Sequence, residues 1–291
     1  MKLYALSTMA SPDLRKVTVD MKEHMFLSDH DQRLSAMFIE QGYVVVDVDD
    51  TDALKRIQHR TASLAAEYLN QSPPSDATVY LDRIHEHVGP DTLNGLRLHV
   101  INGLNNETWI RPSYFALARS ALDCLVGNEL AMQRRVNLSI QLPHDSSSLL
   151  PIHADVWDGD SPFEVVVWLP LVNCFETKAM YLVNPEDDRA LQQHFTDFAD
   201  KSAEDIYQAV RGKAHFIPVQ FGQVMVFSQT LMHGNRINTI DQTRWSINAR
   251  FKSALSPYAD KRLGEFFAPI TLRAATKIGM NYQYNEGFED A

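Results

Sequence analysis

Three residues of this chain have the types and the spacing that suit a metal site. His153 and Asp155 are separated by one residue, and His233 follows eighty residues after His153. Side chains two apart on a strand point to the same face, so His153 and Asp155 are expected to converge on one ion, with His233 arriving from a distant strand. Two imidazoles and one carboxylate on one face of an octahedron leave three positions open, which suits ferrous iron. Zinc more often has a closed four-ligand site, or three ligands and one water.

A candidate anion-binding arginine lies eleven residues after His233. In the run 244–251, period-two spacing places Arg244, Ser246, Asn248 and Arg250 on one face and apolar side chains on the other. A buried arginine needs an anion, and its planar fork matches a carboxylate bidentately. The spacing predicts that a dicarboxylate such as 2-oxoglutarate binds the metal at one end and Arg244 at the other. Arg250 is the alternative anion partner.

The first half of the chain has mainly helical spacing. Its predicted elements are a helix at 33–40 that stops at Gly42, a strand at 43–48, a helix at about 52–70 capped by Asp50 or Thr51, a loop at 71–76, helical fragments through Leu104, and a helix that starts at Pro112 and runs to about Val126. The His85-Glu86-His87 triplet falls in this helical sequence, where side chains two apart diverge, so it predicts no metal site.

The second half has short strands instead. They are predicted at 136–142, 164–172, 213–219, 223–228 and 244–251, with a helical insertion at about 187–211. Neither a glycine-rich phosphate loop nor a strand–helix alternation is present. The pattern therefore favours an α+β protein, mainly β, with a β-barrel or sandwich flanked by helices.

Three segments resemble those of a known enzyme superfamily. The run HADVWDGDSPFEVVVWLPLV (153–172) and the segments FGQVMVF (221–227) and LMHGN (231–235) resemble the Fe(II)/2-oxoglutarate dioxygenases of the phytanoyl-CoA dioxygenase-like superfamily. The similarity is closest to a bacterial subgroup from sporadic carbohydrate-biosynthesis clusters. It covers about residues 130–255, and QGYVV (41–45) resembles the opening strand of that superfamily.

The resemblance implies a fold and a reaction. The fold is a double-stranded β-helix, or jelly roll, and Arg244 falls where the family's 2-oxoglutarate arginine stands. Fe(II) and 2-oxoglutarate would be the cofactor and co-substrate, and O₂ would be consumed with release of succinate and CO₂ as a substrate C–H is hydroxylated. We expect one catalytic domain over 1–291, with a mainly helical part at 1–130, the β-helix core at 131–255 and a C-terminal extension at 256–291.

Further residues are candidates for the same site. Asn137 and Gln141 lie on the polar face of a strand before His153, and the resemblance implies that this strand lends amides to the oxoglutarate pocket; the alternative is a face open to water. Ser246 shares the face of Arg244. Trp157 is predicted to stack on a sugar or merely to pack, and Lys178 to pair with a substrate anion or to be a solvated lysine.

The reaction and the substrate stay open in the sequence. The subgroup implies a sugar or sugar-derived intermediate, and desaturation or epimerisation are further outcomes at the same iron. Halogenation is disfavoured because Asp155 is present, since halogenases of this type replace that carboxylate with a small residue. The competing hypothesis is a cupin-like binding module or sugar isomerase with structural metal or zinc.

Composition narrows the partners. The 27 basic and 37 acidic residues give a net charge of −10, which argues against general nucleic-acid binding. The longest apolar run, 165–172, is too short to cross a bilayer, the N-terminal segment lacks an export signal, and two cysteines, Cys124 and Cys174, fit a reducing cytosol. We therefore expect a cytoplasmic enzyme of a small molecule, with no membrane partner; a homodimer remains open.

Overall fold

The structure is a computed structural model that describes residues 26–283. The N-terminal segment in which no export signal is expected lies outside these residues. No helix within 26–283 has the length and apolar character needed to span a membrane.

Most helices lie in the first half of the chain, as expected. They are α1 (Asp29–Gln41), α2 (Thr51–Tyr68), α3 (Ala77–Asp82), α4 (Pro90–Asn106), α5 (Ile110–Ala116), α6 (Arg119–Leu125), α7 (Pro185–Gln192), α8 (Ala203–Val210) and α9 (Ala274–Met280). Helix α1 ends at Gly42, whose φ of 75° is left-handed and strained for residues with a Cβ. Helix α2 begins after Asp50, whose carboxylate accepts the N–H of Ala53.

The prediction of one helix from Pro112 to Val126 is wrong, because this segment contains parts of two helices, α5 and α6. The helical conformation is interrupted between them at Leu117 and Ala118. Asp49 lies at the break: its N–H donates to the carbonyl of Leu117 at 3.0 Å, and its carboxylate accepts the N–H of Ser120 at 2.7 Å. A residue from a distant loop thus caps the second helix, which local spacing does not reveal.

The strands form two sheets. They are β1 (Tyr43–Asp47), β2 (Leu130–Gln133), β3 (Asn137–Gln141), β4 (Glu164–Pro170), β5 (Tyr181–Val183), β6 (Ala214–Phe216), β7 (Gln223–Ser228), β8 (His233–Gly234), β9 (Arg244–Ser253) and β10 (Phe267–Pro269). The large sheet has the order β1-β7-β4-β9-β2-β10, with β3 also paired to β9, and the small sheet has the order β6-β5-β8. All pairs are antiparallel, and the predicted double-stranded β-helix core is confirmed.

Three strands were absent from the sequence prediction. Strands β2, β5 and β10 have three or four residues each, too few to show a period-two pattern, whereas β8 is the strand on which His233 was expected. The strand expected at 213–219 is shorter than predicted and consists of β6 alone. Pairing partners, rather than local pattern, define these short elements.

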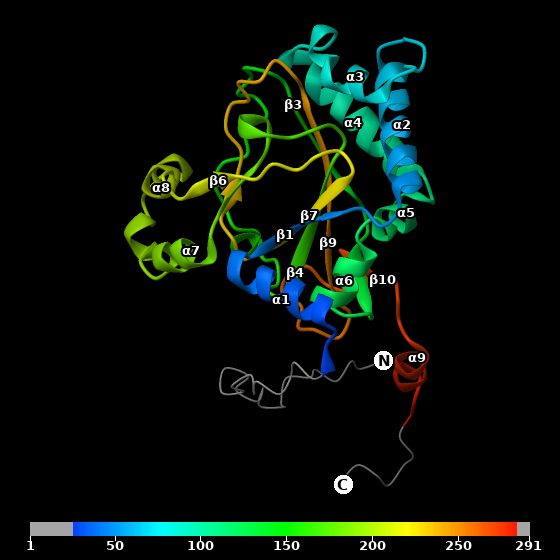
Figure 1. The fold of residues 1–291 in the computed structure, drawn as a ribbon, viewed down its shortest axis with the longest axis vertical. Helices are drawn as coiled ribbons and strands as arrows, with labels where there is room; N and C mark the ends of the chain where they lie inside the picture. Colours follow the sequence, from blue (N-terminus) through cyan, green and yellow to red (C-terminus); the bar gives the residue numbers. More distant parts are fainter. Residues whose placement is uncertain (1–25, 284–291) are drawn as a thin grey trace.

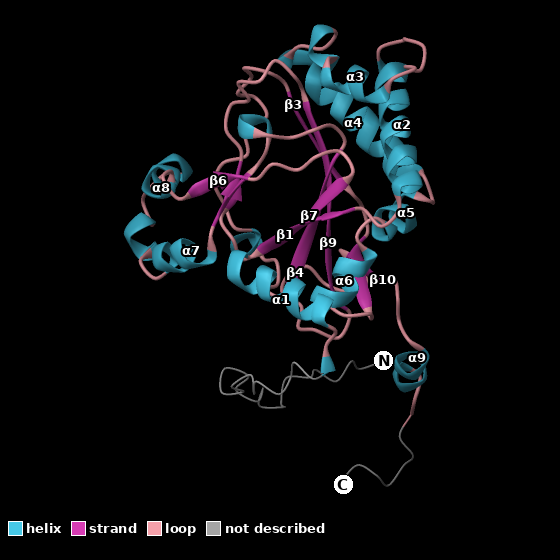
Figure 2. Cartoon of the chain, in the orientation of Figure 1, coloured by secondary structure: helices cyan, strands magenta, loops and turns pink. Residues whose placement is uncertain are grey.

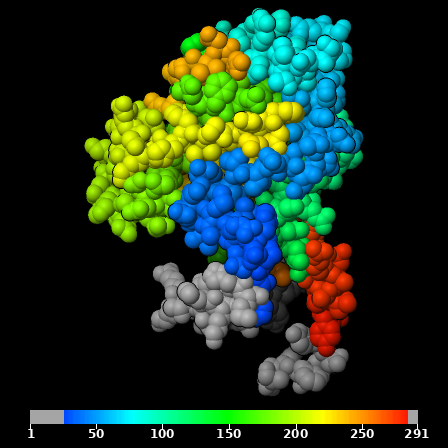
Figure 3. Space-filling model, in the orientation of Figure 1, coloured from blue at the N-terminus to red at the C-terminus, as the bar shows by residue number. Residues whose placement is uncertain are grey.

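The helices cover opposite sides of the β-helix. Helices α2 to α5 gather on one side of the large sheet, and the insertion with α7 and α8 lies on the other (Figures 1 and 2). In the space-filling view the insertion, in yellow-green, protrudes from the body (Figure 3). Leu191, Ile206 and Val210 of this insertion form an apolar cluster with Ile152 and Met232. Each of the last two precedes a histidine of the candidate site, so the insertion packs directly behind the metal ligands.

Candidate metal centre

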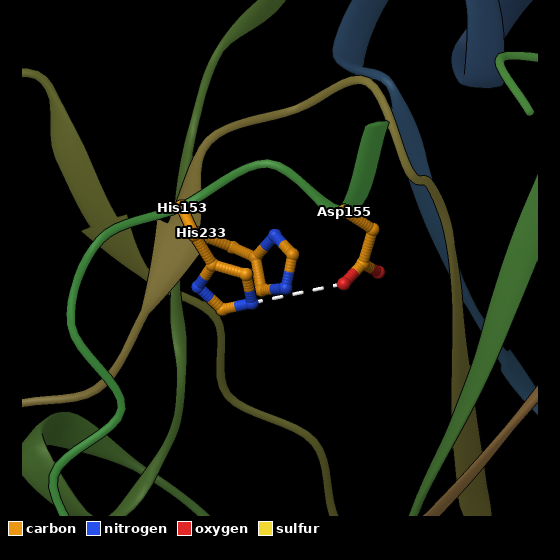
Figure 4. A group of neighbouring side chains, drawn as sticks. All are labelled: His153, Asp155 and His233. Carbon is orange, nitrogen blue, oxygen red and sulfur yellow. Dashed lines mark ion pairs between the residues drawn. The ribbon is translucent and has the colours of Figure 1, made fainter. Parts of the chain in front are cut away.

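The structure brings His153, Asp155 and His233 together. One potential ligand atom from each side chain lies within 4.8 Å of the others, and within residues 26–283 no other such group of three or more is found. The Nε2 atom of His153 is 3.7 Å from Oδ1 of Asp155, and the two imidazole centroids are 4.2 Å apart (Figure 4). Two imidazoles and one carboxylate on one side of a cavity can bind a divalent metal and leave further positions open.

The route by which these residues meet differs from the one expected. His153 pairs with His233 across an antiparallel bridge, with N–H to O distances of 3.0 and 2.8 Å. The expected strand geometry is wrong for Asp155, which begins a short 3-10 helix, Asp155–Asp158. The chain turns inward after the extended residue Ala154, and this turn carries the carboxylate to the imidazoles.

Each histidine is oriented by the backbone carbonyl of the residue two positions before it. The Nδ1 atom of His153 lies 2.8 Å from the carbonyl of Pro151, and that of His233 lies 2.9 Å from the carbonyl of Leu231. A carbonyl oxygen only accepts, so Nδ1 carries the proton in each ring. The Nε2 lone pairs are thereby left for a metal, the usual support of a histidine ligand.

The charges of the site favour the protonation states that bind metal. Burial lowers the pKa of His233 to about 4, with His153 adding to the effect, so this imidazole is neutral at pH 7. Burial would raise the pKa of Asp155, but His233, Arg250 and His153 outweigh it and lower the pKa. A neutral imidazole and an ionised carboxylate are the forms that coordinate a cation.

A cavity of about 380 Å³ opens beside the triad. Besides the three ligands, it is lined by polar side chains from β3, β9 and nearby loops and by an apolar wall: Asn137, Ser139, Asp158, Asn235, Arg244, Asn248 and Arg250, with Leu150, Val166, Trp168, Met180 and Phe227. The polar face of β3, for which exposure to water was the alternative, therefore borders this cavity through Asn137 and Ser139.

Arg244 is a buried cation with no carboxylate partner among residues 26–283. It is 3% exposed, and its Nη2 donates to Oγ of Ser139 at 3.0 Å, while Nε has no hydrogen-bond partner. Burial lowers the pKa of Arg244 to about 10, still well above neutrality. A guanidinium that is charged, buried and only partly satisfied is a strong site for a carboxylate.

Unpaired buried atoms gather around this arginine. Among the described residues, four buried side-chain atoms lack a hydrogen-bond partner, and three belong to the paired strands β3 and β9: Oε1 of Gln141, Nε of Arg244 and Oγ of Ser246. Gln141 donates through Nε2 to the carbonyl of Arg236. Gln141 and Ser246 do not line the cavity, whereas Asn137 does and donates to Asn248 at 3.0 Å. Buried polar atoms without a partner are rare, and of these three only Nε of Arg244 belongs to a residue that lines the cavity, so this atom is the one that indicates a polar ligand there.

Arg250 lines the cavity but is already paired. Its Nη2 lies 2.9 Å from Oδ1 of Asp155, and its Nε lies 3.3 Å from Oδ1 of Asp160. Asp160 also pairs with Lys261. As the alternative anion partner, Arg250 already has two carboxylates of the protein itself, and its geometry suits holding the carboxylate of Asp155 in place.

Two other candidates lie outside the cavity. Trp157 does not continue a strand; it is part of the 3-10 helix, 38% exposed, and packs on Phe195 with ring centroids 4.7 Å apart. Both expectations for Lys178 are wrong, since it is fully buried and binds Asp82 at 2.5 Å and Gln242 at 2.9 Å. A partner carboxylate contributed by α3 holds it inside the protein.

Several lining residues were not predicted. Trp168 and Met180 sit in apolar segments that look like core, and Asp158 follows the triad in the chain. Ser139 lies on the polar face of a predicted strand, between Asn137 and Gln141. Asn248 lies likewise between Arg244 and Arg250, so in both cases the period-two pattern could have identified the residue.

Comparison with known proteins supports the fold. No family model and no curated protein matches the chain. Among solved structures, the non-heme monooxygenase ThoJ in a nickel complex is 17% identical, with 82% of this chain and 84% of ThoJ covered at a TM-score of 0.50. AviO1 from Streptomyces viridochromogenes is also 17% identical, with coverages of 80% and 99% and a TM-score of 0.51. The chain thus shares its fold with a non-heme monooxygenase, and at the level of the fold the resemblance seen in the motifs is confirmed.

Proposed function

We propose that this protein is an Fe(II)- and 2-oxoglutarate-dependent oxygenase that hydroxylates a polar metabolite and releases succinate and CO₂. The observation that carries the proposal is the pairing, within one cavity, of an open His–Asp–His metal group with a buried arginine that has no anion. The assignment of 1–291 to one catalytic domain belongs to this proposal. The carbohydrate substrate implied by the resemblance stays a prediction.

The residues present fit both groups. His153, Asp155 and His233 would hold the iron, and their donor set is the one that ferrous oxygenases use. Arg244, with Ser139 beside it, would hold the distal carboxylate of 2-oxoglutarate, which would satisfy the unpaired Nε. Bound together, iron and 2-oxoglutarate would activate O₂, which is the oxidant: one oxygen atom would enter succinate as 2-oxoglutarate loses CO₂, and the other would convert a substrate C–H into C–OH.

The chain's own residues position and protect these groups. The Nδ1–H donors of the two histidines keep the rings turned toward the site, and Arg250 holds Asp155 by an ion pair. The apolar wall of Val166, Trp168 and Phe227 keeps water from the reacting centre.

The test is anaerobic addition of Fe(II) and 2-oxoglutarate to the folded protein. The proposal predicts a weak visible charge-transfer band of the chelate and, with oxygen and substrate, formation of succinate. Metal binding without this band would favour the cupin-like module or isomerase instead. Succinate release screened against sugars and nucleotide sugars tests the predicted substrate class.

A further inference from the structure

Strand β3 is an edge of the large sheet, and its free side has backbone groups without partners. In the described part of the chain, β3 pairs only with β9. The N–H of Leu171 donates to the carbonyl of Trp245, so the backbone of Trp245 faces β4 and that of Ser246 faces β3. Along an antiparallel strand, successive residues direct their backbone N–H and C=O groups to opposite sides of the strand. The backbone groups of Ser139 therefore face β9, whereas those of Leu138 and Ile140 face the free side of β3.

At this edge, one side chain makes the two backbone hydrogen bonds that a neighbouring strand would make. Asn105 of α4 accepts the N–H of Val136 at 2.9 Å and donates to the carbonyl of Val136 at 3.0 Å. Within residues 26–283, no bond of this kind reaches the backbone of Leu138 or Ile140, although these residues are only 7% and 2% exposed. Backbone groups shielded from bulk water ordinarily have partners, so these four groups call for a ligand.

A groove of about 470 Å³ runs along this free edge. Helix α4, which lies beside β3 in Figure 1, forms one wall with Asn94 and Arg97, and the loop after β3 forms the other with Ser148 and Leu150. Ser139 and Leu150 also line the cavity of the metal centre, and Ser139 bonds to Arg244. The β3-edge groove and the metal cavity are therefore neighbours, and one molecule could extend from the groove into the cavity.

We propose that the β3-edge groove binds an extended, peptide-like part of the substrate, which adds a strand to β3 and places a neighbouring carbon at the metal centre. The inference rests on the proposed function and assigns a substrate class to it. Donor and acceptor pairs two residues apart repeat about every 7 Å along a strand, and another amide chain matches this repeat. The hydroxyls of a sugar do not, so the groove favours an amide substrate over the carbohydrate implied by the resemblance.

The test uses a library of tripeptides with acetylated and amidated ends. With the iron- and oxoglutarate-loaded full chain, we expect some members to raise succinate formation and to gain one oxygen atom. In the best member, N-methylation of an amide that faces β3 lowers turnover about tenfold, the effect of one lost hydrogen bond, whereas methylation of the next amide does not. A panel of free sugars and nucleotide sugars is the opposing arm.

Matched variants and a backbone measurement separate the groove from the chemistry. Asn94→Trp fills the groove and is expected to abolish the peptide response, while Leu98→Trp, on an exposed position of α4 outside the groove, leaves it unchanged. By NMR on the metal-free protein, the best tripeptide is expected to slow amide hydrogen exchange at Leu138 and Ile140 and not at Ser139.

The outcomes of these experiments distinguish a failure of the groove proposal from a failure of the proposed function. Slowed exchange without the oxoglutarate charge-transfer band upholds the groove and refutes the proposed function. The band without slowed exchange for any library member overturns the groove. Coupled turnover by sugars alone, or equal responses of Asn94→Trp and Leu98→Trp, also overturns it.

Discussion

Two arginines on the same face of β9, Arg244 and Arg250, have opposite electrostatic surroundings. Both line the metal cavity. Arg250 pairs with two carboxylates, those of Asp155 and Asp160, whereas within residues 26–283 Arg244 has only the hydroxyl of Ser139 and its Nε is unpaired. We therefore propose a structural role for Arg250 and an anion-binding role for Arg244.

The difference shows that whether a buried arginine has room for an anionic ligand depends on whether the fold places a carboxylate of the protein beside it. Asp155 and Asp160 both come from the turn that follows His153, and this turn ends near Arg250 rather than Arg244. The same strand pattern therefore yields one arginine with two carboxylate partners and, within residues 26–283, one with none. The predictions below test this contrast.

The largest effect is expected from Asp155→Ala, which removes both a metal ligand and a partner of Arg250. Metal-dependent consumption of 2-oxoglutarate should be abolished without unfolding, because Arg250 keeps its pair with Asp160. Succinate formation and circular dichroism measure the two outcomes. Asp200→Ala, at an exposed carboxylate that does not line the cavity, is the control that keeps the metal. Unchanged turnover in Asp155→Ala would remove this residue from the site.

Arg244→Leu is expected to weaken 2-oxoglutarate binding by ~2–5 kcal/mol, because the variant removes the partner of a buried carboxylate. Metal affinity should hardly change, since Arg244 contacts no ligand of the triad. Titration of the charge-transfer band at saturating Fe(II) measures the effect, and Arg244→Lys should restore part of it. A null result would transfer the anion-binding role to Arg250.

Arg250→Gln is expected to have the complementary effect. Losing the ion pair that holds Asp155 should lower metal affinity about 10–100-fold, the range typical of groups that support metal ligands. The affinity for 2-oxoglutarate at saturating metal should stay near that of the unsubstituted protein. Metal titration by calorimetry provides the measurement. If the oxoglutarate affinity falls as far as in Arg244→Leu, the two arginines do not have separate roles.

The smallest effect concerns Asp188, a buried carboxylate that, unlike Asp155, forms no ion pair within residues 26–283. It accepts the N–H of Met232 and an N–H of Gln192, and burial raises its pKa to about 6 from an ordinary value of 3.8. The folded state therefore retains a proton that the unfolded chain releases, and stability declines as pH rises from about 4 to about 6.

Asp188→Asn removes this titration and keeps an acceptor for Met232. The variant should gain about 1–3 kcal/mol of stability relative to the parent above pH 6, and the gain should disappear below pH 4. Urea unfolding across this pH range measures it. A difference that does not vary with pH would show that burial of the Asp188 charge is not its cause.

Much of the site and fold was predictable because the relevant signals are local. The strand pattern of 244–251 is confirmed in β9, and the spacing of His153, Asp155 and His233 brought attention to three residues that do meet. The break between α5 and α6 was not predictable, because the residue that caps α6, Asp49, comes from another loop. The burial of Lys178 was missed for the same reason, since Asp82 lies 96 residues away.

Residue types and short-range spacing by themselves determined the helices, the longer strands and the chemical character of the metal group. Only the tertiary structure decided which arginine is free, where Asp155 turns, and which edge of the sheet stays open. A sequence records what each side chain can donate or accept, whereas pairing and burial depend on groups brought close by folding from far along the chain.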